Sequence, residues 1–437
     1  MLINSHDRLQ ELLEAQAEVN EHRDRTPTEA FYEEKLRRVW ERASGVQAYG
    51  MLDSFSMENF RQLQITSKDE LKKRPLEFCA VTPDGADKYY ETTGTTGLAT
   101  PTPRLASDVI RNAVSVAEAW RPLLAPDDRV LSLLPSDVVP VGDLIAQACE
   151  YLGLVHTRAY PFATGICDWD RLTGIWRTLR PTTVFVAPGV AQQLTRLLKR
   201  RGDLDELSGS VARIMLLGEV NTEPFRVRLG SWWGAAVYDA SYGSTETGTL
   251  ATSCRSGRHH LLPAAHLFEL ATDAGVVPLR AGARGRLVVT PLNMHARPLL
   301  RLDTGDEVTV TDGCPCGSPA PSLVVHGRSS DALVLGGAKV TVRDLEEIVY
   351  GVTGATGYLM EIDPEGTPLR LLLERDGDSD RDLEREMAEA VRTASRDSLR
   401  LSWDTVAFVN SLPATTKSGG SQKSWKRTNI RVVEKVS

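Results

Sequence analysis

The sequence has no apolar run long enough to span a bilayer, and basic side chains do not dominate it. Its 51 Lys and Arg residues are outnumbered by 58 Asp and Glu residues, so the net charge is −7. A nucleic-acid-binding surface needs a basic footprint. Neither nucleic acid nor a membrane is therefore expected as a partner. The first seven residues are polar and then acidic, unlike a signal peptide, so a cytoplasmic location is expected.

Cysteine is also scarce, with six residues in a chain of 437. In a cytoplasmic protein these cysteines are expected to be core thiols or metal ligands rather than disulfides. Internal repeats and low-complexity tracts are absent. The composition, 41% hydrophobic and 25% charged, is typical of a globular protein with a large core. The length indicates two or three domains.

Strand and helix signals alternate in the first half of the chain, which predicts a mostly parallel sheet covered by helices. Ser107 is expected to cap a helix that runs towards residue 124. Strands are expected at 129–134, 182–187, 213–217 and 236–238. The other helices are expected at 7–43, at 142–152, from the end of the 182–187 strand to about residue 200, and at 222–232.

Strands dominate from residue 285, at 285–290 and 307–310, and predict a β-rich part. A small α+β unit then follows, with helices at 342–350 and 380–399 and strands at 358–363, 369–374 and 405–410. The predicted fold class is therefore α/β with a small C-terminal α+β domain. The expected domains are residues 1–328 and 332–437, joined by a hinge at 329–331.

One short segment is dense in threonine and glycine. Glycine lets a ligand approach the backbone, and successive N–H groups with threonine hydroxyls can hold phosphate oxygens. No Lys-Ser or Lys-Thr follows the second glycine, so this is not a Walker A loop. A plain surface turn is the alternative interpretation. The candidate phosphate ligands are Thr92, Thr93, Gly94, Thr95, Thr96 and Gly97.

Later motifs follow in a fixed order: Tyr-Gly-Ser-Thr-Glu at 242–246, Arg-Leu-Asp-Thr-Gly-Asp at 301–306, Gly-Arg at 327–328, and a lysine-rich tail. Over residues 30–437 this ordered set resembles the adenylate-forming (ANL) superfamily, and within it the phenylacetate–CoA ligase branch. The resemblance implies an AMP-forming ligase that uses ATP and Mg²⁺. An acid oxyanion attacks the α-phosphate, pyrophosphate leaves, and an acceptor takes the activated group.

The candidate nucleotide-binding residues follow predicted strands, where ligands bind in open α/β sheets. The resemblance makes Glu246 the ligand of Mg²⁺ and Thr245 its catalytic neighbour, whereas Glu246 alone would also suit a helix N-terminus. Tyr242 is expected to stack on adenine or to be a half-buried core residue. The remaining candidates at these strand ends are Gly218, Glu219, Gly243 and Ser244.

The resemblance assigns roles to three more residues. Asp306 would accept hydrogen bonds from the ribose hydroxyls, although its Thr-Gly-Asp context is also an ordinary turn. Arg328 would contact ribose or phosphate, unless it is a solvated arginine. Lys423 would neutralise the attacking anion and the α-phosphate. Its assignment competes with Lys417 and Lys426, because Gln422 replaces the usual glycine.

Cysteine and histidine recur in a pattern suited to tetrahedral Zn²⁺. Cys254, His260, Cys314 and Cys316 form the expected closed, structural set, with His259 as the rival to His260. Some members of the branch carry such a set at matching positions. Buried free thiols are the alternative.

The sequence departs from the family pattern at the phosphate loop and at the acyl pocket. Leu98 stands where the family has a lysine, and Arg104 is a candidate replacement for its charge. Asp303 replaces the second arginine of a common Arg-Tyr-Arg, and residues 135–143 diverge from the glycine- and aromatic-rich acyl pocket. CoA, an amine, or an arylamine when nitrite is activated (a diazotase) therefore all remain as acceptors. A different class of function, an inactive scaffold on the same fold, is the alternative to an enzyme. The protein could also form a homodimer.

Overall fold

The computed structural model of the chain describes residues 3–92, 99–163, 165–328, 332–413 and 429–433. The chain divides into two compact units. The first contains residues up to 175, 181–185 and 239–326, and the second contains 176–180, 186–238 and the residues from 327 on. The predicted hinge at 329–331 lies outside the described residues.

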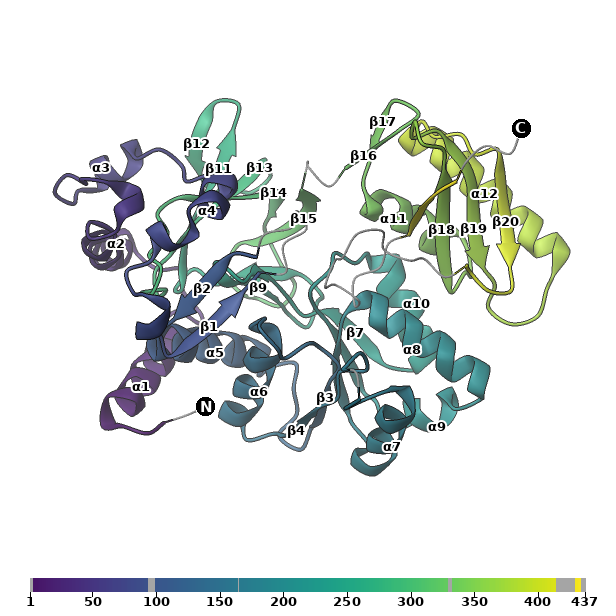
Figure 1. Cartoon of the computed structure of the whole chain (residues 1–437), viewed down its shortest axis with the longest axis horizontal. Coiled ribbons are helices and arrows are strands. Elements are labelled where there is room, and N and C mark those ends of the chain that lie inside the picture. Colours follow the sequence, from purple (N-terminus) through teal and green to yellow (C-terminus); the bar gives the residue numbers. More distant parts are fainter. Residues whose placement is uncertain (1–2, 93–98, 164, 329–331, 414–428, 434–437) are drawn as a thin grey trace. The chain divides into compact units, whose positions relative to one another are not determined.

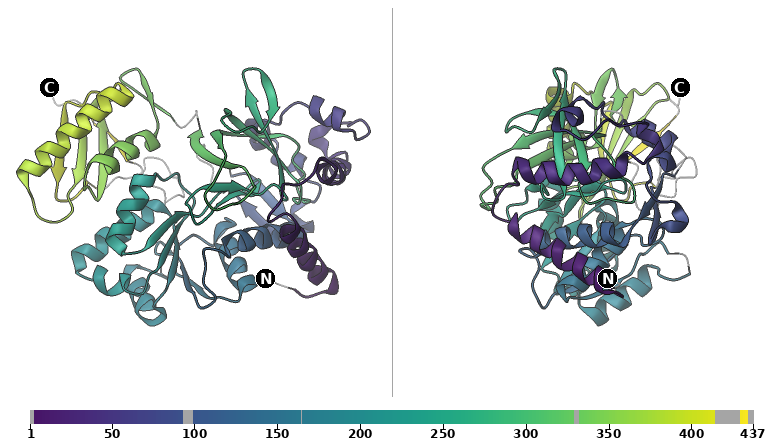
Figure 2. Two further views of the ribbon diagram at one scale, coloured as in Figure 1. Left: turned by 180° about the vertical axis from the view of Figure 1, so that it is seen from behind. Right: turned by 90° about the vertical axis from the view of Figure 1, so that its left-hand side faces the viewer.

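The N-terminal region forms two helices, α1 (His6–Glu21) and α2 (Glu29–Ala43), so the prediction of one helix over 7–43 was wrong. The first helix ends at Glu21, and Pro27, whose missing N–H cannot donate within a helix, lies between the two. Thr28 then caps the second, because its hydroxyl accepts from the Phe31 N–H at 3.2 Å. Figures 1 and 2 show α1, in purple, packed along α5 (Ala106–Trp120).

Helix α5 begins one residue before the predicted cap and ends four residues before the predicted end. Leu105, not Ser107, is its N-cap residue. The Asp108 carboxylate accepts from the Leu105 N–H at 3.0 Å and so satisfies the first turn. The predicted cap and helix end were therefore wrong, although the helix itself is confirmed.

The predicted parallel sheet is present, with strand order β4-β3-β5-β6-β7. Strand β3 pairs parallel with both β4 and β5. The strands are β3 (Arg129–Ser132), β4 (Val155–Arg158), β5 (Thr183–Val186), β6 (Arg213–Leu216) and β7 (Ala236–Asp239). The helices between them are α6 (Val141–Leu152), α7 (Trp169–Leu179), α8 (Pro188–Arg201), α9 (Leu204–Ser208) and α10 (Glu223–Trp233). The sequence predicted every one of these strands except β4.

The β-rich part is an eight-stranded sheet with strand order β12-β11-β13-β14-β15-β10-β9-β8. Its buried leucines and valines, such as Leu270, Leu287 and Val308, form one apolar core. The strands are β8 (Ser241–Ser244), β9 (Gly248–Ser253), β10 (His259–Leu261), β11 (His266–Thr272), β12 (Gly275–Pro278), β13 (Arg284–Pro291), β14 (Leu302–Thr311) and β15 (Ser322–Arg328). Sequence patterns found only two of them.

Short elements cover the remainder of the first unit. The ribbon of β1 (Lys88–Glu91) and β2 (Pro101–Arg104) brackets the threonine- and glycine-rich segment. Two short helices, α3 (Met57–Gln62) and α4 (Lys68–Lys73), follow α2, together with the 3₁₀ turns Gln47–Tyr49, Pro75–Phe78 and Pro83–Gly85. No helix in the described part of the chain combines the length and apolarity needed to cross a bilayer.

The C-terminal elements follow the predicted α+β order, and α12 lies across their sheet (Figure 2). The sheet has strand order β20-β19-β18-β21. Within the second unit these elements contact α8: Arg196 Nε donates to Glu374 at 2.6 Å, and Gln192 Nε2 donates to the Tyr350 hydroxyl at 2.6 Å. The elements are β16 (Leu333–Leu335), β17 (Ala338–Val340), α11 (Val342–Val352), β18 (Gly357–Ile362), β19 (Pro368–Glu374), α12 (Arg381–Leu399), β20 (Thr405–Val409) and β21 (Ile430–Val432).

Candidate functional site

The segment 242–246 forms a tight hairpin rather than the start of a helix. Tyr242, Gly243 and Ser244 belong to β8, and Glu246 lies in the turn before β9. The helix-terminus interpretation of Glu246 was therefore wrong. A Cβ at Gly243 would lie 2.3 Å from the Gly248 carbonyl oxygen, so the hairpin requires glycine there.

The Glu246 side chain is buried, with a residue exposure of 4%. Burial by itself would raise its pKa, but the positive charges of Lys68 and Arg297 and the Ser244 hydroxyl together lower that pKa. The carboxylate therefore stays ionised at neutral pH. An ionised carboxylate is the hard oxygen ligand that Mg²⁺ prefers.

Tyr242 and Asp306 meet although 64 residues separate them in the chain. The Tyr242 hydroxyl donates to Asp306 Oδ2 at 2.7 Å, and the ring packs against the apolar core of the eight-stranded sheet. Asp306 lies inside β14, so its assignment to an ordinary turn was wrong. The hydrogen bond thus brings together the two residues that the sequence analysis assigned to adenine and to ribose.

The threonine- and glycine-rich segment is closed at its base. The Thr92 N–H donates to the Thr100 carbonyl at 3.2 Å, and the Thr100 N–H donates to the Thr92 hydroxyl at 3.0 Å. The other candidate phosphate ligands, Thr93, Gly94, Thr95, Thr96 and Gly97, lie outside the described residues.

Arg104 connects this segment to the hairpin. It ends β2, which begins directly after Thr100. Its Nη2 donates to the carbonyl oxygens of Thr245 at 2.7 Å and Glu246 at 2.9 Å. The base of the candidate phosphate loop and the candidate Mg²⁺ ligand are therefore joined by one side chain.

The candidates Gly218 and Glu219 belong to the second unit. Gly218 follows β6 with φ +86°. The Glu219 carboxylate accepts from the Gly189 N–H at 3.1 Å, at the start of α8, which gives it a helix-capping role that the sequence analysis did not consider. Arg328 ends β15. Lys423 and its rivals Lys417 and Lys426 lie outside the described residues.

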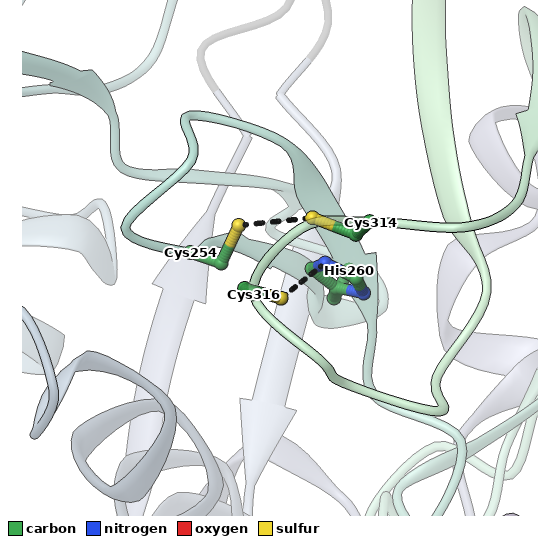
Figure 3. A group of neighbouring side chains, drawn as sticks. All are labelled: Cys254, His260, Cys314 and Cys316. Carbon is green, nitrogen blue, oxygen red and sulfur yellow. Dashed lines mark hydrogen bonds between the residues drawn. The ribbon is translucent and has the colours of Figure 1, made fainter.

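The four predicted zinc ligands converge (Figure 3). Their ligand atoms all lie within 4.8 Å of one another. The Cys254 and Cys314 sulfurs are 3.6 Å apart, and Cys316 Sγ is 3.3 Å from His260 Nε2. Sulfur ligands about 2.3 Å from a tetrahedral zinc ion lie about 3.8 Å from each other, so the residues fit the ion.

The surroundings of this Cys/His cluster favour the same metal. His260 Nδ1 lies 2.8 Å from the Ala320 carbonyl oxygen, which fixes the ring with Nε2 towards the cysteines. Burial opposes ionisation of Cys314, yet hydrogen bonds from the cluster lower the pKa of its thiol, and zinc binds thiolates. The rival His259 instead bonds the Asp239 carbonyl oxygen at 2.7 Å and is not in the cluster.

A cavity of about 670 Å³ adjoins the cluster. Cys254, His260 and Cys316 line it, together with the C-terminal end of α5. Neither Tyr242 nor Glu246 lines this cavity, so it is separate from the nucleotide-site residues.

Sequence reasoning missed a second buried arginine, Arg297, which no motif marks. Its side chain is fully buried, and its Nη1 donates to the Pro101 carbonyl oxygen at 2.8 Å. Burial, and then the charge of Arg104, lower the pKa of Arg297 to about 10, so it remains protonated at neutral pH. Only tertiary proximity to Glu246 identifies it.

No family model matches the chain. Over 366 residues it is 26% identical to phenylacetate-coenzyme A ligase of Thermus thermophilus, covering 77% of this chain and 79% of that protein. Over 330 residues it is 24% identical to the Escherichia coli enzyme of the same name, covering 72% of each.

Two solved structures show the same fold. The 2-hydroxyisobutyryl-CoA ligase, in its postadenylation state, has a TM-score of 0.72 at 18% identity and covers 98% of this chain and 89% of its own. The acyl acid amido synthetase AtGH3.15 has a TM-score of 0.64 at 13% identity, with coverages of 93% and 90%. The ordered motifs, the relatives and the fold together support a member of the adenylate-forming (ANL) superfamily, and the two curated relatives that it resembles at 24–26% identity are phenylacetate-coenzyme A ligases.

Proposed function

We propose that the protein is an AMP-forming ligase that activates a small aromatic acid as its adenylate and transfers it to CoA or an amine. The observation that carries the proposal is the contact of Arg104 with the carbonyl oxygens of Thr245 and Glu246. It joins the base of the candidate phosphate-binding segment to a buried, ionised carboxylate. That arrangement suits a triphosphate bound with its metal ion.

Each residue of the first unit then has a defined task towards Mg·ATP. The Tyr242 ring supports the adenine, and the Asp306 carboxylate accepts hydrogen bonds from the ribose hydroxyls. Two carboxylate oxygens provide about four acceptor positions, so Asp306 can serve Tyr242 and the ribose together. Glu246, next to Thr245, would hold the Mg²⁺ of the nucleotide. That ion, when bound, offsets negative charge on the phosphates.

The reaction that this site supports has two steps. In the first, an acid oxygen attacks the α-phosphorus, and the bond to pyrophosphate breaks. In the second, the acceptor attacks the activated carbonyl group, and AMP leaves with the bonding electrons. We propose that Lys423 stabilises the negative charge of the first step. A hinge at 329–331 would let residues 332–437 move between the two steps.

We assign a structural role to the Cys/His cluster. Cys254, His260, Cys314 and Cys316 would hold one Zn²⁺ with four protein ligands, which leaves no open position for a substrate. The ion would tie the β9–β10 hairpin to the segment between β14 and β15 and would take no part in the chemistry.

Pyrophosphate release, measured with a panel of acids and acceptors, tests the proposed function. The panel contains aromatic and small aliphatic acids with CoA or amines, and nitrite with arylamines. Hydroxylamine traps an acyl-adenylate as a hydroxamate, which separates carboxylate activation from the diazotase reaction. Acid-dependent pyrophosphate and AMP are expected in equal amounts. If none of the acids in the panel supports pyrophosphate release, adenylation is contradicted. If the protein also binds no nucleotide, the inactive scaffold is favoured.

Two substitutions connect that activity to the site. Glu246→Ala and Asp306→Ala are each expected to lower the rate about 10²–10³-fold, because each removes one preorganised charged group. Glu307→Ala is the matched control, since Glu307 neighbours Asp306 but pairs with Arg284 at the surface. Wild-type rates in both site variants, with folded protein by circular dichroism, would refute the assignment.

A further inference from the structure

Two buried arginines flank Glu246, and each keeps one nitrogen without a partner. Among the described residues, Arg104 Nη1 and Arg297 Nε are buried and make no hydrogen bond. The residue exposures are 5% for Arg104 and 0% for Arg297. A buried, unbonded donor is costly, most of all on a charged group. Such groups in a folded protein call for an explanation beyond packing.

The other nitrogens of the two arginines form a continuous series of contacts. Arg297 donates to the Pro101 carbonyl oxygen at 2.8 Å and to the Thr102 hydroxyl at 3.0 Å, so it holds the start of β2. Arg104, two residues farther along β2, holds the carbonyl oxygens of Thr245 and Glu246. Strand β2 is thereby fixed between Arg297 and the hairpin turn.

The nearby acid is already committed to the backbone. Asp108 accepts from the N–H groups of Leu105 at 3.0 Å, His295 at 2.6 Å and Ala296 at 3.1 Å. Its carboxylate therefore serves chiefly to shape the 295–296 segment that precedes Arg297. The Asp108 charge also acts on Arg104, and both guanidinium groups place positive charge beside Glu246.

We propose that Arg104 and Arg297 are positioning residues for Mg·ATP. They fix the Thr245–Glu246 peptide against β2 and supply the positive charge on this side of the phosphate site. This inference rests on the proposed function. It goes beyond that function because it assigns the geometry of the Mg²⁺ ligand to two arginines outside the motifs.

The test measures binding of α,β-methylene-ATP by calorimetry, so it needs no knowledge of the acid. Arg104→Lys and Arg297→Lys keep the charge but lose the forked hydrogen bonds. Each is expected to weaken binding about 10-fold or more with Mg²⁺ present, which corresponds to the loss of one charged hydrogen bond. Without Mg²⁺ the loss of affinity should be much smaller. The substitutions misplace Glu246, which contributes to nucleotide binding through the metal ion.

Arg111→Lys is the matched control. Arg111 is a buried arginine on α5 that pairs with Glu14 and Glu18 of α1, at 3.3 Å each, outside the nucleotide site. The Arg111→Lys substitution should lower the melting temperature without changing the affinity for α,β-methylene-ATP. The inference is overturned if both site variants bind like wild type, or if their loss is equal with and without Mg²⁺. Failure of wild type itself to bind the analogue would refute the proposed function instead.

Discussion

At the scale of single residues, hydrogen bonds and burial define the properties of two polar groups, Asp306 and His266. The Tyr242 hydroxyl donates to the Asp306 carboxylate at 2.7 Å. His266 is a base that burial keeps neutral, with Nε2 2.8 Å from the Thr249 carbonyl oxygen. Each of these two residues leads to a separate prediction.

Asp306→Asn should remove discrimination between ATP and 2′-deoxy-ATP. If the carboxylate accepts hydrogen bonds from both ribose hydroxyls, the wild-type protein should bind ATP about 10-fold more tightly, because a hydrogen bond to a charged group is lost with the deoxynucleotide. The variant, with a weaker acceptor, should bind both nucleotides about equally. Glu307→Gln should keep the wild-type preference. Unchanged discrimination in Asp306→Asn would remove Asp306 from the ribose site.

The stability of the first unit should fall as the pH drops from about 6.5 to 4. Burial lowers the pKa of His266 to about 4 from its ordinary 6.5, so the unfolded chain binds more protons in this window. Unfolding then becomes easier with acid, by about 3 kcal/mol at its lower end. His266→Gln should flatten part of this slope in urea titrations, the rest coming from His295, whose pKa burial also lowers. An unchanged slope would contradict the assignment.

At the scale of elements, the eight-stranded sheet brings distant loops together. The β9–β10 hairpin and the segment between β14 and β15 have no reason to meet from local sequence, yet their cysteines are 3.6 Å apart. A metal ion shared by both would cross-link them, and the energy of metal binding would become folding energy.

Purified protein is therefore expected to contain one zinc ion per chain by elemental analysis. Cys314→Ser should lose most of it and lower the melting temperature, and a chelator should lower the melting temperature of wild type in the same way. Cys79→Ser is the control, because Cys79 lies outside the cluster. This variant should keep the zinc content of wild type. Zinc-free wild type that melts unchanged in chelator would leave the cluster as free thiols.

At the scale of the whole molecule, the second unit groups residues 186–238 with the residues from 327 on. Helix α8 holds the C-terminal elements through Arg196 and Gln192. The proposed movement of residues 332–437 would have to exchange these contacts, and it would carry the lysine-rich tail towards or away from the nucleotide.

Lys423→Ala should suppress pyrophosphate release yet leave the consumption of a supplied acyl-adenylate intact. Negative charge gathers at phosphorus only in the first step, so a lysine that serves that step is dispensable for the second. Lys417→Ala should affect neither step. Equal loss in both steps would make Lys423 structural, and selective loss in Lys426→Ala would shift the role to that lysine.

The sequence by itself determined the strand–helix alternation, the order of the C-terminal elements, the family motifs and the three cysteines of the Cys/His cluster, whereas the choice of His260 over His259 came from the structure. These follow from local periodicity, from residue types that one chemistry requires and from the order in which they occur. The prediction of a single helix over 7–43 was wrong for a local reason. The apolar spacing continues across the region, but Pro27 and the Thr28 cap start a new helix at Glu29.

Only the tertiary structure decided which of these residues share a site. Arg104 reaches the Thr245 carbonyl oxygen across 141 residues, and Tyr242 reaches Asp306 across 64. Six strands of the eight-stranded sheet were missed. Hairpins join β8, β9 and β10 and join β11 to β12, but the burial of these strands also depends on β13 and β15, which lie farther along the chain. Arg297 carries no motif at all. Its part in the site arises from the burial of a charge beside Glu246, which no local pattern encodes.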